Sequence, residues 1–214
     1  MALTPTSGPS VRIAPAPLSS LPAHHRLVAR LAGAATGGEP PHVFTTLARH
    51  RRLFRRWLPF GGTLLLHPLL PRRDVELVVL RTAWSCGSWY VWVQHVGLAR
   101  RVGLPDDVVA RVPLGASTAG WTPRQRMLLE ATDQLVEDHL VTDDVWSRLA
   151  SQLDERQLIE LCLLVGHYAM LAMALNSLGV EPELTALSRL PESSAAWAQQ
   201  LRDRLVRLRT TVSG

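Results

Sequence analysis

The sequence predicts an all-α protein, and two observations support this fold class. Apolar residues recur at helical spacing along most of the chain, with little of the period-2 alternation that is typical of strands. Residues that end helices separate these segments, such as Gly103 followed by Pro105, and Gly179. The chain has 214 residues, of which 47% are hydrophobic, so it can bury a substantial core.

The first half of the chain is expected to hold four long helices. Pro22 fits the first turn of one helix, and a second is expected to carry the apolar residues from Val43 to Phe54. A third is predicted over residues 73–84 and a fourth over residues 88–102, separated by a Cys-Gly-Ser sequence. The fourth has the best-marked end, because a glycine follows it and is followed in turn by a proline.

Capping motifs mark the helices of the second half. Pro105 and the two aspartates after it are expected to start a short helix. The segments Thr122–Gln125 and Asp154–Gln157 have the pattern of capping boxes, and Thr142 is expected to cap a helix between them. A final amphipathic helix is predicted from an apolar stripe formed by Trp197, Leu201, Leu205 and Leu208.

These elements divide the chain into three regions. Residues 1–20 are rich in proline, serine and alanine, which is typical of a flexible arm, or of one ordered only by a neighbouring subunit. Residues 21–190 are expected to form the helical domain and residues 191–214 the C-terminal amphipathic helix. The stripe on that last helix favours a contact with the core or with another subunit over a membrane surface.

Composition favours a soluble, cytoplasmic protein. The N-terminus lacks the pattern of a signal peptide, and the most apolar segment, residues 161–175, is short for a membrane span. Cys86 and Cys162 lie far apart in the sequence, so no disulfide framework is expected and a reducing compartment is the default. The formal charge of +5 permits an anionic partner without requiring one.

The most basic segment lies within the second expected helix. We interpret it as a solvated helix face paired with acids, and the alternative is a surface that binds anions or nucleic acid. No nucleic-acid-binding motif accompanies it, so neither a nucleic acid nor a membrane is expected as a partner. The run consists of Arg49, Arg51, Arg52, Arg55 and Arg56.

One stretch carries a recognisable motif. The segment Glu76-Leu-Val-Val-Leu-Arg81, followed by Cys86-Gly-Ser-Trp-Tyr-Val-Trp-Val-Gln-His95, resembles the signature of the carboxymuconolactone decarboxylase / alkyl hydroperoxidase D superfamily. The resemblance extends over roughly residues 40–185 and includes Trp57, Trp121 and the segment Gly166–Tyr168. It implies a small helical bundle that assembles into a homo-oligomer, as a dimer, trimer or hexamer.

The resemblance also implies how the chain departs from its relatives. Alkyl hydroperoxidase D-like members use a glutamate, a Cys-x-x-Cys pair and a histidine, and the glutamate and histidine match Glu76 and His95. The positions of the two redox cysteines are occupied by Ser88 and Val91. Decarboxylase-like members carry a glutamate where Val91 stands, and position 89, often polar in relatives, is Trp89. These changes favour a larger or more hydrophobic substrate.

The motif supplies the candidate site residues. His95 is the candidate general acid/base, because imidazole is a natural proton shuttle near neutral pH. Glu76 is expected to orient that ring, or alternatively to form a buried ion pair with Arg81 or another arginine. Cys86, just before a helix N-terminus that would favour its thiolate, is a candidate donor or nucleophile, or a small core residue. The expected substrate-binding residues are Ser88, which is first a helix cap, and Trp89, Tyr90 and Val91.

We therefore expect a cofactor-independent enzyme of the lyase or isomerase type. It would act on a small, rather apolar carbonyl or lactone compound by decarboxylation, isomerisation, ring opening or cyclisation. The alternatives are a thiol redox enzyme and a non-catalytic ligand-binding or scaffold protein. No metal site is predicted, because His67 and His167 have no metal-ligand spacing with His95. The sequence also contains no phosphate-binding loop and no dinucleotide-binding fingerprint.

Overall fold

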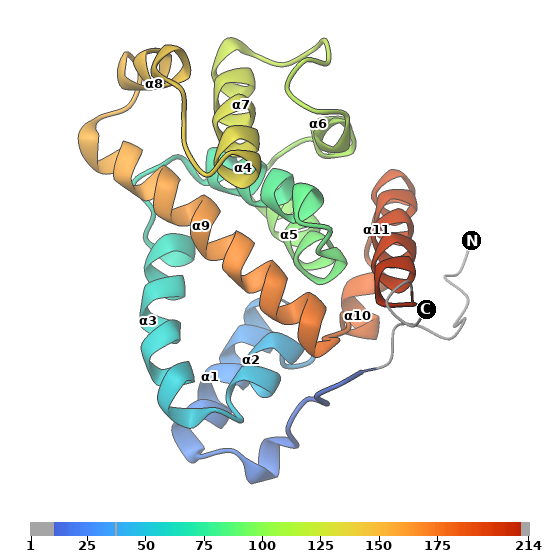
Figure 1. Ribbon diagram of the computed structural model, residues 1–214. Coiled ribbons are helices and arrows are strands. Elements are labelled where there is room, and N and C mark those ends of the chain that lie inside the picture. Colours follow the sequence, from blue (N-terminus) through green and yellow to red (C-terminus); the bar gives the residue numbers. More distant parts are fainter. Residues whose placement is uncertain (1–10, 37, 211–214) are drawn as a thin grey trace.

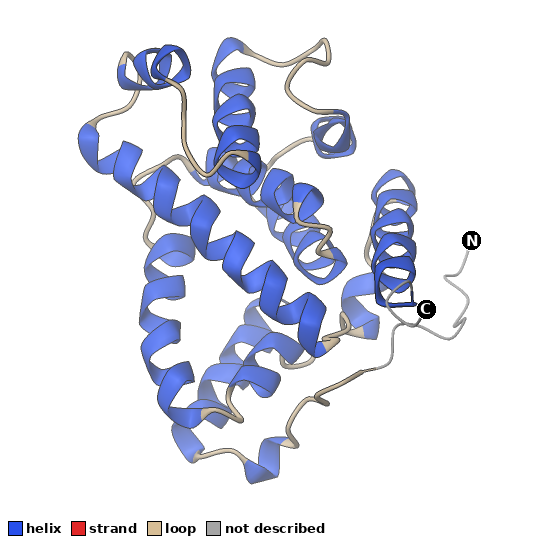
Figure 2. Cartoon of the chain, viewed as in Figure 1, coloured by secondary structure: helices blue, strands red, loops and turns tan. Residues whose placement is uncertain are grey.

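The computed structural model describes residues 11–36 and 38–210, and every regular element in them is a helix (Figure 2). The all-α fold class is therefore confirmed.

Four helices form the centre of the bundle: α4 (Arg72–Ser85), α5 (Trp89–Arg101), α7 (Pro123–Glu137) and α9 (Glu155–Leu178). The long helix α9 crosses the molecule diagonally in Figure 1, and α4 packs against α5, α7 and α9. In α4, residues 75–80 are all buried in succession. Consecutive positions point to every side of a helix, so α4 is surrounded by protein on all sides.

The other helices of the C-terminal part surround this centre. They are α6 (Asp106–Arg111), the short 3₁₀ helix η2 (Val112–Leu114), α8 (Asp143–Ala150), α10 (Leu184–Leu187) and α11 (Glu192–Thr210). The predicted stripe on α11 packs against α5 and α6, with Leu201 and Leu205 buried, whereas Leu208 is exposed.

An N-terminal layer packs on the other side of α9 (Figure 1) and comprises η1 (Leu18–Ser20), α1 (Ala23–Thr36), α2 (His42–Leu47) and α3 (Arg51–Leu66). The single helix expected over residues 43–54 is therefore wrong, because the chain breaks between α2 and α3. The break has a local cause: the imidazole of His50 accepts a hydrogen bond from the N–H of Leu53, and so caps the start of α3.

The expectation of a flexible arm over residues 1–20 needs correction where the chain is described. The N–H groups of Arg12 and Ile13 donate to the carbonyl of Leu178 at the end of α9, at 3.1 and 3.0 Å. Further along, Ala16 is buried in a small apolar cluster with Phe54. Residues 11–20 are thus held against the bundle, and residues 1–10 lie outside the described part of the chain.

The capping motifs are confirmed at two of four helices. Thr122 and Asp154 each form a complete capping box, with both hydrogen bonds present. Thr142 and Ser88 occupy N-cap positions, as predicted, but neither side chain makes the capping bond. The hydroxyl of Thr142 instead contacts the side chain of Gln134.

The arginine run was expected to pair with acids, and this interpretation is wrong for the described residues. The Arg49 side chain donates to the carbonyl oxygen of Ala14 at 2.8 Å. None of the ion pairs in residues 11–36 and 38–210 includes a member of the run. The physical reason is composition: between residues 11 and 73, the only acid is Glu39.

The described residues contain one helix, α9, that is long and apolar enough to cross a membrane. This is weak evidence for a span, since the central helix of a bundle has the same composition. Here α9 packs against α3, α4, α5, α7 and α8.

Candidate active site

A break between α4 and α5 positions the candidate dyad. Cys86 ends α4, Gly87 adopts the left-handed conformation with φ of +64°, and Ser88 precedes α5. The N–H of Ser88 donates to the carbonyl of Ala83 at 2.8 Å, which closes the turn. The tight turn lays α5 back along α4, so that residues ten positions before the turn and eight after it can meet.

Glu76 and His95 do meet across this break. The Nδ1 atom of His95 lies 2.8 Å from Oε2 of Glu76, and the exposed fractions are only 6% for His95 and 3% for Glu76. An ionised carboxylate can only accept a hydrogen bond, so Nδ1 is the nitrogen that donates to it, and in a neutral imidazole this leaves Nε2 as the acceptor. The pair has the form of a general base held by an orienting acid.

The alternative partner for Glu76 is excluded by the same geometry. Arg81 lies in a bidentate contact with Asp133, with distances of 2.5 and 3.1 Å, and also donates to the carbonyl oxygen of Val112. Glu76 is therefore paired with His95 and not with Arg81.

Aromatic side chains from α9 and α3 pack around the imidazole. The ring of Tyr168 stands edge-on to that of His95, with centroids 4.9 Å apart. Burial, and then the charge of Glu76, raises the pKa of Tyr168, so its phenol stays neutral. The neighbouring His167 stacks near Trp57 at 6.0 Å and meets Phe60 edge-on at 5.3 Å.

His167 is a second buried imidazole close to the dyad. Burial is the main cause that lowers its pKa to about 4, and the nearby His95 adds to the effect. Its Nδ1 atom is buried and has no hydrogen-bond partner among the described residues. A neutral, unpartnered ring nitrogen is a potential hydrogen-bonding group for a ligand. The sequence offers one signal for His167, its position beside Tyr168 in the apolar segment that forms α9.

The predicted substrate-binding residues have different surroundings. Ser88 is fully buried with an unpartnered hydroxyl, and Val91 is buried one turn before His95. Trp89 lies under the guanidinium of Arg202 on α11, 5.4 Å from its ring centroid. Trp89 and Tyr90 therefore have partners other than the dyad, and they link α5 to neighbouring elements.

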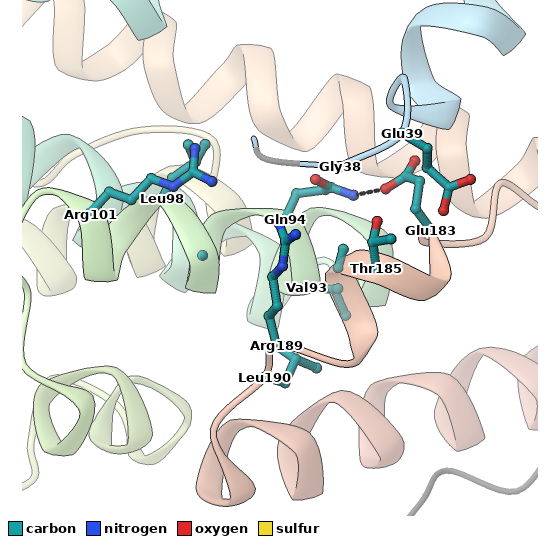
Figure 3. Close-up of a pocket in the computed structure, with 12 residues that line it drawn as sticks. Gly38, Glu39, Val93, Gln94, Leu98, Arg101, Glu183, Thr185, Arg189 and Leu190 are labelled. Atoms are coloured by element: carbon teal, nitrogen blue, oxygen red, sulfur yellow. Dashed lines mark hydrogen bonds between the residues drawn. The ribbon is translucent and has the colours of Figure 1, made fainter. Parts of the chain in front are cut away.

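Tyr90 belongs to a buried network around Glu183. Its hydroxyl donates to Glu183 Oε1 and accepts from the N–H of Val43, both at 3.0 Å. Burial and the charge of Glu183 raise the pKa of Tyr90. The side chain of Gln94 also donates to Glu183, as Figure 3 shows.

Cys86 does not have the lowered pKa that its position suggested. Burial raises the pKa of its thiol, and the charge of Arg204 opposes this only in part. The side-chain amide of Asn176 donates to the carbonyl of Cys86 at 3.2 Å. Because Asn176 and Cys162 are 14 residues apart on α9, or roughly 21 Å along its axis, the two cysteines of one chain are too distant for a disulfide.

Two surface pockets lie near these helices, and the dyad lines neither. One, of about 60 Å³, is formed by α5, α10 and the connection between α1 and α2, and its lining includes Gln94, Arg101 and Glu183 (Figure 3). The other, of about 380 Å³, lies between Trp84 and Arg204 at α11. The described residues contain no group of three side chains suited to bind a metal.

Residues 51–134 match the model of the Carboxymuconolactone decarboxylase family, from the start of α3 to near the end of α7. No curated protein matches the chain. Solved structures with a similar fold include an uncharacterised peroxidase-related protein from Ralstonia eutropha JMP134 with an alkylhydroperoxidase AhpD core. It has a TM-score of 0.74 and 22% identity, covering 84% of this chain and 98% of the other.

Two further structures have similar folds. A peroxidase-related protein from Silicibacter sp. TM1040 has a TM-score of 0.74 and 14% identity, covering 86% of this chain and 97% of the other. A variant of the debrominase Bmp8, in complex with 2,3,4-tribromopyrrole, has a TM-score of 0.71 and 13% identity, covering 91% and 100%. Identities this low show a common fold and not a common reaction. The matched segment and the shared fold both support the resemblance to the carboxymuconolactone decarboxylase / alkyl hydroperoxidase D-like superfamily.

Proposed function

We propose that this protein is a cofactor-independent enzyme that moves protons on a small, rather apolar carbonyl or lactone substrate. The observation that carries the proposal is the buried contact between Glu76 and His95, 2.8 Å long, formed across the break between α4 and α5. A buried carboxylate beside an imidazole is a recurrent arrangement for general acid/base catalysis.

In the proposed mechanism, Glu76 holds the ring through Nδ1 and Nε2 of His95 exchanges protons with the substrate. His95 removes a proton from the carbon beside the carbonyl, and the electron pair of that C–H bond moves into an enolate. Returning the proton at another carbon gives isomerisation. If carbon dioxide leaves instead, a protonated His95 supplies the proton to the resulting carbanion. Glu76 stabilises the imidazolium that forms in the first case.

The surroundings of the dyad support an apolar substrate. Val91 stands where decarboxylase-like relatives carry a glutamate, and Tyr168 and Trp57 add aromatic surface. The structure of Bmp8 with tribromopyrrole supports a small, flat ring as a suitable substrate shape for this fold. The unpartnered Nδ1 of His167 is suited to bind a polar group on such a ring.

A second candidate is a non-catalytic ligand-binding or scaffold protein. It is favoured by the two pockets described above, because the dyad lines neither of them. For the enzyme, the substrate would enter by a movement between α3 and α9, as lids move in many enzymes. The thiol redox alternative is disfavoured, because the pKa of Cys86 is raised and Cys162 is out of its reach within one chain.

Deuterium exchange tests the proposal without a known substrate. Cyclic monoketones and substituted γ-lactones in D₂O would be followed by NMR for exchange at the carbon beside the carbonyl. We expect the wild type to accelerate exchange for at least one compound, and His95→Gln to lose at least a hundredfold of that rate. His67→Gln, at an exposed histidine, is the matched control. Thermal stabilisation by a compound without any exchange would favour the non-catalytic candidate.

A further inference from the structure

The outward face of α9 carries an unusual pattern. From Leu158 to the end of the helix, every exposed position falls in one row: residues 159, 163, 166, 170, 173 and 177. Ile159, Leu163, Met170 and Met173 are 61%, 48%, 51% and 63% exposed. The row has no charged residue. The opposite side of the helix is buried in the core, so α9 is apolar on both sides. We call residues 159–173 of this row the α9 seam.

The spacing of the α9 seam has a defined physical meaning. Its members follow one another at intervals of four, three, four and three residues, which is the period at which one helix packs along another. Gly166 lies at the centre of the seam, and a side-chain carbon placed there would meet no other atom within 4 Å. A second helix can therefore approach the backbone closely at this point.

We propose that the α9 seam is the interface for a second copy of this chain, with the two α9 helices antiparallel about Gly166. The seam is nearly symmetric around this glycine, with side chains three and seven residues before it and four and seven after it. In an antiparallel pair related by a twofold axis, Leu163 meets Met170 of the other copy and Ile159 meets Met173. Such an interface is self-complementary, because each contact occurs twice. This proposal does not rest on the proposed function.

The size of the apolar surface agrees with a dimer. Each of the four half-exposed seam side chains presents on the order of 100 Å² of apolar surface. Together they present a few hundred Å², the range in which exposed patches mark interaction sites. Phe60 and Leu69 extend the patch, since Phe60 contacts His167 and the N–H of Leu69 binds Glu160 on α9. At the same ~100 Å² each, the six side chains present about 600 Å², which is most of the roughly 800 Å² that each partner buries in a stable complex.

The oligomeric state tests the proposal. We expect sedimentation velocity to give twice the 23.6 kDa of one chain for the wild type. Leu163→Glu and Met170→Glu each place a charge in the seam and should raise the dimer dissociation constant at least a hundredfold. Leu184→Glu is the matched control, because Leu184 is 80% exposed and lies on α10. Circular dichroism checks that the variants keep their helices.

Cysteine cross-linking tests the orientation, in a Cys162→Ser background. Oxidation should link the double variant Leu163→Cys/Met170→Cys into a covalent dimer, whereas the single variants should stay largely unlinked. Residues seven apart on one helix are about 10 Å apart, too far for a disulfide within one chain. Efficient linking of the single variants would overturn the antiparallel arrangement.

Two other outcomes would overturn the interface itself. One is a wild-type protein that is monomeric. This includes a monomer that binds phosphatidylglycerol vesicles through the α9 seam and therefore sediments with them. The other is an oligomer of any size whose mass Leu163→Glu and Met170→Glu leave unchanged.

Discussion

The central helices and the N-terminal layer differ in how their ionisable groups are paired. In the centre, Glu76 contacts His95, and the carboxylate of Glu160 accepts hydrogen bonds from the N–H groups of Leu69 and Leu70. In the N-terminal layer, His25 is 2% exposed, and neither of its ring nitrogens has a hydrogen-bond partner among the described residues.

The contrast extends to the arginines and shows where charge matters in this fold. Arg81 is held by Asp133 and a backbone carbonyl, whereas Arg51 and Arg55 have no acidic partner in the described chain and instead lower the pKa of His25. Paired groups fix the geometry of the centre, so removing one partner there should be costly. Unpaired groups in the outer layer make that layer sensitive to pH and to changes of charge.

The largest expected effect is a difference in proton-transfer rate between variants of two buried histidines, His95 and His25. His95→Gln should lower the rate of any proton-transfer reaction by a hundredfold or more, because glutamine cannot exchange a proton with the substrate. His25→Gln should leave that rate within twofold of the wild type. Both rates would be measured by deuterium exchange, with circular dichroism as the check on folding. Equal loss in the two variants would show that the effect is structural.

The second prediction compares two arginines by stability. Arg81→Met leaves Asp133 and the carbonyl oxygen of Val112 without their partner, and should lower the free energy of unfolding by about 3 kcal/mol. Arg55→Met removes an exposed cation that lacks an acidic partner, and should change it by less than about 0.5 kcal/mol. Urea unfolding followed by circular dichroism measures both. Similar values for the two variants would contradict the contrast between the regions.

The same contrast explains what the sequence could predict. Glu76 and His95 were predictable because they flank one local turn, and a Cys-Gly-Ser break fixes how two consecutive helices fold back. The capping boxes at Thr122 and Asp154 were predictable for the same reason, since all their atoms lie within four residues. Which residues form the pair, and what chemistry to expect of the side chains beside them, came only from the resemblance to the family motif.

Long-range packing set the features that the sequence did not reveal. Trp57 and His167 are about 110 positions apart and meet only because α3 packs on α9. The raised pKa of Cys86 follows from burial, which outweighs the helix terminus beside it. The break between α2 and α3 depends on His50, a residue that rarely caps a helix.

The third prediction concerns His167, at the border between the two regions. Its pKa is about 4 in the folded protein, against 6.5 for a histidine in the unfolded chain, so between these values the unfolded chain binds a proton that the folded chain does not. The free energy of unfolding should therefore fall as the pH drops from 6.5 towards 4, by about 3 kcal/mol from this residue. His167→Phe should remove this part of the pH dependence. An unchanged slope in urea unfolding between pH 4 and 6.5 would contradict the assignment.

The smallest expected effect tests the unpaired cations of α3. Burial is the first cause that lowers the pKa of His25, followed by His24, Arg55 and Arg51. In the double variant Arg51→Gln/Arg55→Gln, the pKa of His25 should rise towards its ordinary value, which would be measured by NMR titration of the ring protons. Because the lowered pKa costs stability as the pH falls below about 6.5, the variant should lose less stability at pH 5 than the wild type, by a few tenths of a kcal/mol. Adding salt to the wild type should produce the same shift by screening the two charges, whereas it should change the variant much less. A salt response that is equal in both proteins would mean that Arg51 and Arg55 do not contribute to the lowered pKa of His25.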